Sequence, residues 1–363
     1  MQNNQSSERI VLVVGATGFI GKFLVAQLLQ DNDHVFALCR NLGQQEASLK
    51  AWLEKQAIDH QNLICIQGDI ILPDLGVSVE DWKQLATVTH LLNTSALFAW
   101  NLSMQQAREV NVKGVINLLQ CVNEHCQLKR VIHLSGYMLT LTQHLQEAGI
   151  CLENIETTNW TAVYQKLGAY EASKIEAHFA WMQCAQQLKI DWTVIHPATV
   201  IGDENFGEIE ENQPIAHLIK QLKRGKMTAI PATPQHYLPL VSVTMLVNAI
   251  CKASHDQHAI HQEILIANPS QISLQALIQQ VAHTLSLQPP QYFVSLRILK
   301  LILKWKWLAR QLDLSVEMLS FIRTEQLDIN QFLAFNQKWQ IPETNLKQTI
   351  ELTTEWISQN HKL

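Results

Sequence analysis

The sequence lacks a Cys-x-x-Cys pair, although seven cysteines are spread along its 363 residues. In a chain of this length, scattered cysteines predict free thiols in a reducing compartment and argue against a disulfide framework. No run of about 18 uninterrupted apolar residues is present, so no membrane-spanning helix is expected. The start of the chain, Met1 to Arg9, is polar and contains no apolar signal core. These absences predict a cytoplasmic protein.

A basic excess is also missing, because 27 Lys and Arg residues stand against 32 Asp and Glu, for a net charge of −5. This balance is untypical of a protein that binds nucleic acid. Three histidines lie close together in His255-Asp-Gln-His258-Ala-Ile-His261. On a helix this spacing spreads the side chains apart, and no thiolate or carboxylate pattern accompanies them. We therefore expect no metal site.

Short apolar runs alternate with helical patterns through the first half of the chain. The runs are rich in Val, Ile and Leu, as parallel strands covered on both faces require. Their alternation with helices predicts an α/β, doubly wound parallel sheet of Rossmann type with right-handed crossovers. The expected strands are Ile10–Val14, Val35–Cys39, Leu63–Gln67, Thr89–Asn93, Arg130–Leu134 and Trp192–His196, and the expected helices are Ile20–Gln30, Met104–Cys126 and Ala169–Leu188.

The pattern changes after about Gly202, where a Gly- and Pro-rich stretch with one expected helix is followed by a strand-to-helix pattern and then by mainly helical sequence. We expect a Rossmann NADP-binding domain over residues 1–202, with 238–253 returning to it. Residues 203–237 and 254–363 should form a smaller, mainly helical substrate lobe. Open α/β sheets bind ligands at the carboxyl ends of their strands, and the lobe is expected there.

Three glycines, Gly15, Gly18 and Gly21, stand three residues apart between the first expected strand and the first expected helix. The first permits a tight turn, the second lets a pyrophosphate approach the backbone, and the third lets the helix pack closely on the strand. The start of the helix offers free N–H groups and a positive dipole end to the phosphates. This segment predicts a dinucleotide site, with Thr17, Phe19 and Ile20 also contacting the cofactor.

Arg40 ends the second expected strand, where a site that prefers NAD usually has Asp or Glu for the ribose hydroxyls. A guanidinium can instead bind a 2′-phosphate through two hydrogen bonds. Arg40 therefore favours NADP(H), with NAD(H) as the alternative cofactor.

Tyr170 and Lys174 open a helical pattern and are four residues apart, so they lie on one helix face. A phenol is a weak base at neutral pH, and a neighbouring ammonium lowers its pKa. The lysine can also hold the ribose of the cofactor. Because the pair lies downstream of a nucleotide site, it predicts that Tyr170 acts as a proton donor or acceptor.

With these motifs, the chain resembles the extended short-chain dehydrogenase/reductases over nearly its whole length. It looks most like an NADP-using branch with dihydroflavonol-reductase-like and thioester-reductase-like members. The matching residues are Gly15, Gly18, Gly21, Gly68-Asp69, Asn93 to Ala96, Asn111, Ser135, Tyr170, Lys174 and His196-Pro197-Ala198.

The resemblance implies roles for several of these residues in cofactor binding. Asp69, with the adjoining Ile70, would contact the adenine. Ser95 and Ala96 would lie along the cofactor, and Asn111 would support the geometry of the active site. Pro197 and Ala198 would frame the nicotinamide.

One position departs from the family pattern, because Gly136 stands where the catalytic hydroxyl normally follows the serine that matches Ser135. That hydroxyl orients and stabilises the substrate oxygen as charge develops. Three interpretations stay open. Ser135 supplies the hydroxyl, Tyr137 or a downstream hydroxyl such as Thr140 replaces it, or the protein binds cofactor with altered or poor catalysis.

The expected chemistry is hydride transfer between NADP(H) and a carbonyl or alcohol, including an acyl thioester, on an apolar or amphipathic small molecule. One alternative is a nucleotide-sugar epimerase or dehydratase, and another is a catalytically weak NADP-binding regulatory protein. The basic, Trp-containing segment 292–312 is interpreted as a cap over the substrate pocket or, alternatively, as a peripheral membrane contact. Family resemblance also suggests a homodimer formed through 104–126 and 169–188.

Overall fold

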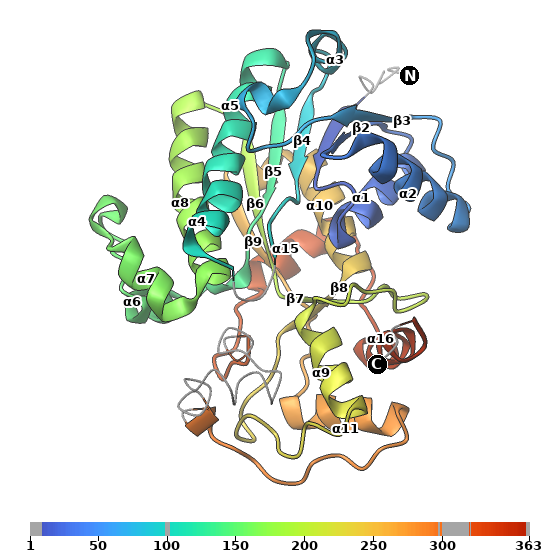
Figure 1. The fold of residues 1–363 in the computed structure, drawn as a ribbon, viewed down its shortest axis with the longest axis vertical. Coiled ribbons are helices and arrows are strands. Elements are labelled where there is room, and N and C mark those ends of the chain that lie inside the picture. The colour runs from blue at the N-terminus through green and yellow to red at the C-terminus, as the bar shows by residue number, and fades with distance from the viewer. Residues whose placement is uncertain (1–8, 99–101, 297, 300–318, 320, 361–363) are drawn as a thin grey trace.

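A parallel sheet of seven strands runs through the centre of the molecule (Figure 1). The structure is a computed structural model, and it describes residues 9–98, 102–296, 298–299, 319 and 321–360. The strand order is β3-β2-β1-β4-β5-β6-β9, so the order reverses direction between β1 and β4. The strands are β1 (Ile10–Val14), β2 (His34–Cys39), β3 (Leu63–Gln67), β4 (His90–Asn93), β5 (Arg130–Leu134), β6 (Trp192–Pro197) and β9 (Gln262–Ile266). The predicted doubly wound α/β fold is confirmed.

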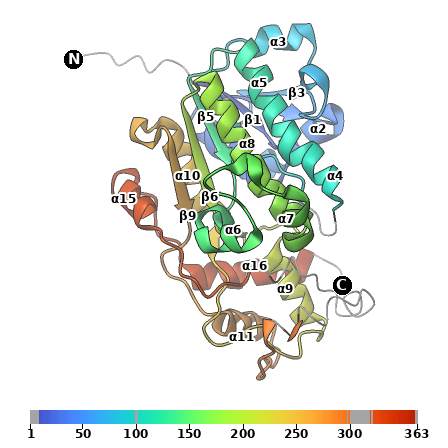
Figure 2. The same ribbon diagram turned by 90° about the vertical axis from the view of Figure 1, so that its left-hand side faces the viewer.

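Both faces of the sheet are covered by helices, which explains the near-continuous apolar character of the strands (Figures 1 and 2). Along β1, Val11 and Val13 pack into one core, and Leu12 and Val14 into the other. The first core is closed by α1 (Phe19–Gln30), α2 (Leu42–Lys55) and α10 (Val243–His255), and the second by α3 (Val79–Leu85), α5 (Val115–His125) and α8 (Ala169–Leu188).

The expected long helix Met104–Cys126 contains a π-helical stretch. It begins as α4 (Met104–Ala107), widens into η2 (Arg108–Gly114) and continues as α5. Such π-helical insertions occur often at functional sites, because they turn one side chain away from the regular helical position. Here the stretch contains Asn111, a predicted site residue.

Strand β9 was missed by the sequence analysis, which placed its residues within the substrate lobe. In the structure β9 pairs with β6 from Thr193 opposite Gln262 to Pro197 opposite Ile266. The strand is at the edge of the sheet, and its first two residues are not buried. A short edge strand that begins with polar residues shows little hydrophobic periodicity in the sequence. The strand becomes evident only from its pairing with β6 in the structure.

The lobe lies beyond the carboxyl ends of the strands, beside a second sheet of two parallel strands (Figure 1). This small sheet consists of β7 (Thr199–Ile201) and β8 (Leu240–Ser242). The lobe helices are α9 (Pro214–Lys223), α11 (Leu274–Thr284) and α16 (Leu346–Asn360), while α15 (Asn330–Trp339) lies against β9. The division of the chain into two domains stays a prediction.

Further short helices are η1 (Pro73–Gly76), η3 (Tyr137–Thr140), α6 (Thr142–Ala148), η4 (Ile155–Thr157), α7 (Trp160–Leu167) and η5 (Gln257–Ala259). The three clustered histidines do not share one helix. His255 ends α10, His258 belongs to η5, and His261 precedes β9.

Within the described part of the chain, no helix has the length and apolar character needed to cross a bilayer. Most of segment 292–312 falls outside the described residues, so its interpretation as a cap or a membrane contact stays a prediction. Of its described residues, Tyr292 is exposed, whereas Leu299 is buried against Leu319.

Helix α1 approaches the turn after β1 so closely that only glycine fits at Gly21. A Cβ atom there would lie 1.9 Å from the Gly15 carbonyl oxygen and 2.9 Å from the Ala16 Cα. Both neighbours are backbone atoms, so neither can rotate away.

We therefore expect Gly21→Ala to lower the free energy of unfolding by at least about 2 kcal/mol, as overpacking of a core does, and to weaken dinucleotide binding. Gly43→Ala is the matched control, because Gly43 is in helix α2 with nothing within 4 Å of its Cβ position. Alanine favours a helix interior, so this variant should be neutral or more stable. Urea unfolding measures both, and equal stabilities for the two variants would contradict the packing argument.

Candidate active site

The glycine turn forms a cradle at the point where the strand order reverses. Gly15 has a φ of +83°, and a Cβ there would lie 2.8 Å from the Ser95 amide nitrogen and 2.9 Å from the Thr94 hydroxyl oxygen. The Gly18 amide donates to the Gly15 carbonyl at 3.0 Å, which closes the turn. Gly18 is the N-cap of α1 and has no side chain to cap the helix. The first N–H groups of α1 therefore remain available to an anion.

Two cavities extend from this turn in opposite directions and share Gly15, Gly18, Thr94 and Ala96 in their walls. The first has a volume of about 350 Å³, and the second of about 220 Å³. Because they meet at the glycine turn, they form one groove that extends to both sides of this turn. Its first end is lined by Thr17, Arg40, Asp69, Ile70 and Ser95, and its second end by Phe19, Ile20, Gly21, Ser135, Tyr170, Lys174, Pro197 and Ala198.

The end of the groove near β2 presents one cation and one carboxylate. Arg40 directly follows β2 and is exposed, and its carbonyl accepts a hydrogen bond of 2.7 Å from the Gln67 side chain. Asp69 follows β3, and its carboxylate accepts from the Ile71 amide at 3.2 Å. Both residues line the first cavity of the groove.

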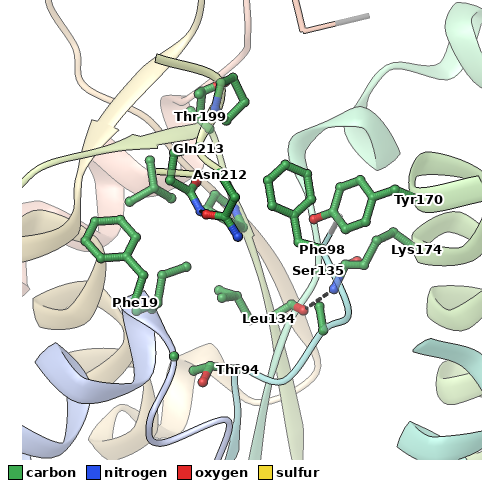
Figure 3. A pocket seen from close by; sticks show the side chains of 18 of the residues that line it. Phe19, Thr94, Phe98, Leu134, Ser135, Tyr170, Lys174, Thr199, Asn212 and Gln213 are labelled. Atoms are coloured by element: carbon green, nitrogen blue, oxygen red, sulfur yellow. Dashed lines mark hydrogen bonds between the residues drawn. The ribbon is translucent and has the colours of Figure 1, made fainter. Parts of the chain in front are cut away.

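The other end of the groove brings together Ser135, which directly follows β5, with Tyr170 and Lys174 of α8 (Figure 3). The Lys174 amine donates to the Leu134 carbonyl at 2.9 Å, which joins α8 to the end of β5. The Tyr170 ring lies edge-on to Phe98, with 4.5 Å between the ring centroids. The three residues predicted as catalytic therefore line the same cavity.

Burial changes the proton affinities of the tyrosine and the lysine. It raises the pKa of the Tyr170 phenol, and the neighbouring Glu171 carboxylate raises this pKa further. Burial also lowers the pKa of Lys174 from its usual 10.5 to about 8. The net pKa of Tyr170 thus lies above its usual value, although a neighbouring ammonium by itself would lower it. The physical reason is that desolvation dominates, while the ammonium is bonded to the Leu134 carbonyl.

The hydroxyl groups around Gly136 differ in their hydrogen bonding. The Tyr137 hydroxyl donates to the Phe321 carbonyl at 3.1 Å, and the Thr140 hydroxyl donates to the Tyr137 carbonyl at 2.8 Å. The Ser135 hydroxyl is buried and has no partner among the described atoms. Of the three, Ser135 is therefore the one whose hydroxyl is not already engaged.

The space beside Gly136 is filled by a methionine. A Cβ at Gly136 would lie 2.5 Å from the Met138 sulfur and 3.0 Å from its terminal carbon. The φ of Gly136 is −164°, an extended value that any residue adopts. The departure from the family pattern thus has a packing consequence: the Met138 thioether lies where the missing side chain would begin.

Asn111 joins the segment after β4 to the catalytic helix. Its side chain accepts from the Leu97 amide at 2.7 Å and donates to the Ser173 hydroxyl at 2.9 Å. It does not line either cavity of the groove. Its π-helical position lets one side chain hold both elements.

The wall facing Tyr170 comes from segments that the sequence analysis did not assign to the site. Figure 3 shows Asn212 and Gln213 across the cavity from Ser135 and Tyr170. Glu210 also lines it, and burial raises the pKa of this carboxyl. No motif marks these residues, because they lie in a loop whose position depends on the packing of α9. The remaining unassigned lining residues include Phe98, Met138, Val200 and Phe321.

A partly buried polar cluster ties the C-terminal part of the chain to the catalytic helix. Glu171, next to Tyr170, is 2.6 Å from the His144 Nε2 and 3.6 Å from the Arg323 guanidinium. The guanidinium also lies 5.8 Å from the centroid of the Tyr137 ring. The cluster brings Phe321, two residues before Arg323, to the wall of the cavity.

A groove across the reversal point of this sheet, with Tyr170 and Lys174 at one end, defines an NAD(P)-binding oxidoreductase of the extended short-chain dehydrogenase/reductase type. The sequence model of the family described as Male sterility protein matches residues 13–250. The match covers more than half of the chain, and the chain belongs to this family. The family resemblance drawn from the sequence is confirmed.

Curated relatives share low sequence identity with this chain. The fatty acyl-CoA reductase wat of Drosophila melanogaster is 22% identical over 280 residues, which cover 68% of this chain and 54% of the relative. The nonribosomal peptide synthetase inpA of Emericella nidulans is 24% identical over 216 residues, which cover 54% of this chain and 14% of the synthetase. The chain thus spans about half of the fly reductase and a small part of the synthetase.

Solved structures with similar folds include both reductases and epimerases. The terminal R domain of the myxalamid PKS-NRPS pathway aligns with a TM-score of 0.73 and 16% identity, over 97% of this chain and 91% of that domain. Gre2 of Candida albicans in complex with NADPH aligns with a TM-score of 0.69 and 20% identity, over 98% and 100% of the two chains. UDP-glucuronic acid 4-epimerase of Bacillus cereus in complex with NAD aligns with a TM-score of 0.67 and 17% identity, over 97% of this chain and 100% of that chain. At these identities the likeness concerns the fold alone.

The lowered pKa of Lys174 predicts a pH-dependent stability difference for Lys174→Met. The change from 10.5 to about 8 corresponds to about 3 kcal/mol. Between these pH values the folded protein binds fewer protons than the unfolded chain, so the Lys174 contribution to stability rises with pH. Below pH 8 the buried ammonium is destabilising, and methionine removes that cost while losing one hydrogen bond worth about 1 kcal/mol.

We expect the cofactor-free Lys174→Met protein to exceed the wild type in unfolding free energy by about 2 kcal/mol at pH 7. The advantage should disappear as the pH approaches 10.5. Urea unfolding at a series of pH values measures this, with Lys83→Met as the control because Lys83 is exposed on α3. A stability difference that does not change with pH would refute the argument.

Proposed function

We propose that this protein is an NADP(H)-dependent reductase that acts on a carbonyl compound or an acyl thioester with an apolar or amphipathic body. One observation carries the proposal. The unpartnered Ser135 hydroxyl lies with Tyr170 and Lys174 at one end of a groove that has Arg40 at its other end.

The groove fits a nicotinamide dinucleotide. The glycine cradle leaves no room for a Cβ at Gly15, and the N-terminus of α1 faces the same turn. A pyrophosphate at this turn would place the adenosine toward Asp69 and Arg40, and the nicotinamide toward Pro197 and Ala198. When bound, the nicotinamide supplies the hydride.

The residues of the chain would handle the substrate oxygen and its proton. Ser135 would donate a hydrogen bond to the oxygen, and Tyr170 would donate the proton as the oxygen becomes an alkoxide. The raised pKa of Tyr170 keeps the phenol protonated, as a donor requires. Lys174, whose amine is held by the Leu134 carbonyl, lies one helical turn away and would stabilise the phenolate that remains.

The lining of the cavity supports an apolar substrate. Phe98, Met138, Val200 and Phe321 contribute apolar surface, and Lys174 is the single cation among the described residues in this wall. A nucleotide sugar would bring a diphosphate without a cationic partner there. The fatty acyl-CoA reductase relative adds support for an acyl thioester substrate.

The roles of the family-matched residues, a homodimer formed through 104–126 and 169–188, and a membrane contact through 292–312 stay predictions. The chemistry proposed above needs the roles of Ser135, Tyr170 and Lys174, and it needs neither the homodimer nor the membrane contact. These predictions concern how the reductase binds its substrate, a second subunit and a membrane.

The purified protein should oxidise NADPH, followed at 340 nm, with at least one member of a panel of long-chain aldehydes, ketones and acyl thioesters. Ser135→Ala should lower kcat by roughly 10²-fold to 10³-fold, as the loss of a donor to a developing oxyanion does. Thr140→Val is the matched control, because its hydroxyl is bonded to the Tyr137 carbonyl and should not affect turnover.

Equal kcat for Ser135→Ala and the wild type would remove Ser135 from the mechanism. Tight NADPH binding without turnover on any substrate class would favour the regulatory alternative. Release of an isomerised nucleotide sugar, without net NADPH consumption, would favour the epimerase alternative.

Arg40 should set the preference for NADPH. The Arg40→Ala protein should bind NADPH roughly 10-fold to 100-fold more weakly, because a charge-assisted bidentate bond contributes about 1.5 to 3 kcal/mol. Its affinity for NADH should stay about the same. Isothermal titration of both cofactors tests this, with Lys83→Ala as a control for the loss of a positive charge. Equal losses for the two cofactors would exclude recognition of the 2′-phosphate.

A further inference from the structure

Two histidines and a glutamate converge on the α8 side of the sheet, outside the groove. His178 comes from α8, His196 from β6 and Glu263 from β9. The His196 Nε2 lies 2.8 Å from the Glu263 carboxylate, and the His178 Nε2 lies 3.3 Å from the same oxygen. One ligand atom from each residue lies within 4.8 Å of the other two. In the described part of the chain, no other His, Cys, Asp or Glu group of this kind occurs.

The hydrogen bonds of His196 determine what its second nitrogen can do. The Nδ1 lies 3.1 Å from the Gly136 carbonyl, which only accepts, so Nδ1 carries the proton. A neutral ring then presents a lone pair from Nε2 toward the carboxylate of Glu263. Two acceptors face each other at 2.8 Å unless a cation or a second proton lies between them.

His178 presents its Nε2 to the same point. The residue is only 5% exposed, and its Nδ1 has no partner among the described atoms. The interaction of this ring with a polar group is therefore made through Nε2, toward Glu263. Three donor atoms thus face one small space from three separate elements.

We propose that His178, His196 and Glu263 bind a divalent transition-metal ion, with Zn²⁺ as the best match. Two imidazole nitrogens and one carboxylate oxygen form a recurrent zinc ligand set, which leaves a fourth position for water. Atoms bound to one zinc ion at about 2.0 to 2.2 Å lie about 3 to 4 Å apart. The observed histidine–glutamate separations of 2.8 and 3.3 Å lie near this range, and the ligand atoms of the two histidines are within 4.8 Å of each other.

The surroundings of the three residues agree with a metal site. The bond from the His196 Nδ1 to a backbone carbonyl is the outer contact that orients most metal-bound histidines. The Glu263 side chain is 42% exposed at the sheet edge, so an ion and a water ligand can enter there. Both histidines are buried and would lose little conformational freedom on binding.

An ion at this position would join two elements that line the active site, α8 and β6, to the edge strand β9. His178 follows Lys174 by one helical turn, and His196 directly precedes Pro197. The bond from His196 to the Gly136 carbonyl reaches the wall of the substrate cavity. The ion would therefore brace α8, β6 and β9 behind the catalytic residues, without contact with the substrate. This inference does not depend on the proposed reductase activity.

The test is direct metal binding by the full chain. Protein treated with EDTA and dialysed should bind one equivalent of Zn²⁺ in isothermal titration, and elemental analysis after desalting should retain it. Zn²⁺ should raise the thermal midpoint by about 3 °C or more, since a ligand that binds the folded state stabilises it. EDTA should reverse the shift, and Co²⁺ should produce a visible absorption band from the same site.

Two variants and one control make the outcome specific. Glu263→Gln keeps the size and polarity of an exposed side chain, and His178→Gln replaces a ring whose Nδ1 has no partner to lose. Each should weaken the stoichiometric Zn²⁺ site at least about 10-fold and abolish the thermal shift. His258→Ala removes an exposed histidine of η5 and should bind Zn²⁺ as the wild type does.

The proposal is overturned if the wild type binds no stoichiometric Zn²⁺, or if both folded variants bind it as tightly as the wild type. It is also overturned if His258→Ala alone removes the binding. Either ligand variant decides the question when the other fails to fold.

Discussion

The active site depends on the close approach of helix α1 to the turn that ends β1. Because Gly21 has no side chain, α1 comes within van der Waals distance of the Gly15 backbone. This contact places the N-terminus of α1 directly over the carboxyl end of β1, where the strand order reverses. The two halves of the groove meet at this turn. A bulkier residue at Gly21 would push the helix away from the backbone of Gly15 and Ala16, which forms the turn.

Desolvation determines the direction of the pKa shifts at the catalytic end of the groove. Burial raises the pKa of Tyr170 and lowers that of Lys174, so each group is shifted toward its neutral form. Such a pair is prepared to exchange a proton with a substrate oxygen, since neither charge is strongly stabilised before reaction. The bond from Lys174 to the Leu134 carbonyl keeps the amine near Ser135, which follows in the chain. The same backbone connection therefore positions the lysine and the hydroxyl.

The cavity that would receive the substrate is assembled from distant parts of the chain. Glu210 and Asn212 come from the loop before α9, and Phe321 lies near the partly buried Glu171–Arg323 contact. The packing that brings these segments together is shared with the helix that carries Tyr170. Changes in the lobe could therefore alter substrate choice without altering the glycine turn or the catalytic pair.

The sequence alone determined those features whose residues are close together in the chain. The glycine turn, Arg40 after β2, and the pair Tyr170 and Lys174 are each set by spacing within a single turn or helix. The six strands predicted between Ile10 and His196 were recognised because their apolar runs are short and covered on both faces.

Tertiary structure alone decided the features that join residues far apart in the chain. Strand β9 is defined by its pairing with β6, and the wall opposite Tyr170 by the packing of the lobe. The sign of the Tyr170 pKa shift followed from burial, which spacing on a helix does not reveal. The convergence of His178, His196 and Glu263 has the same origin, because a parallel sheet and its covering helix bring together side chains that no linear motif connects.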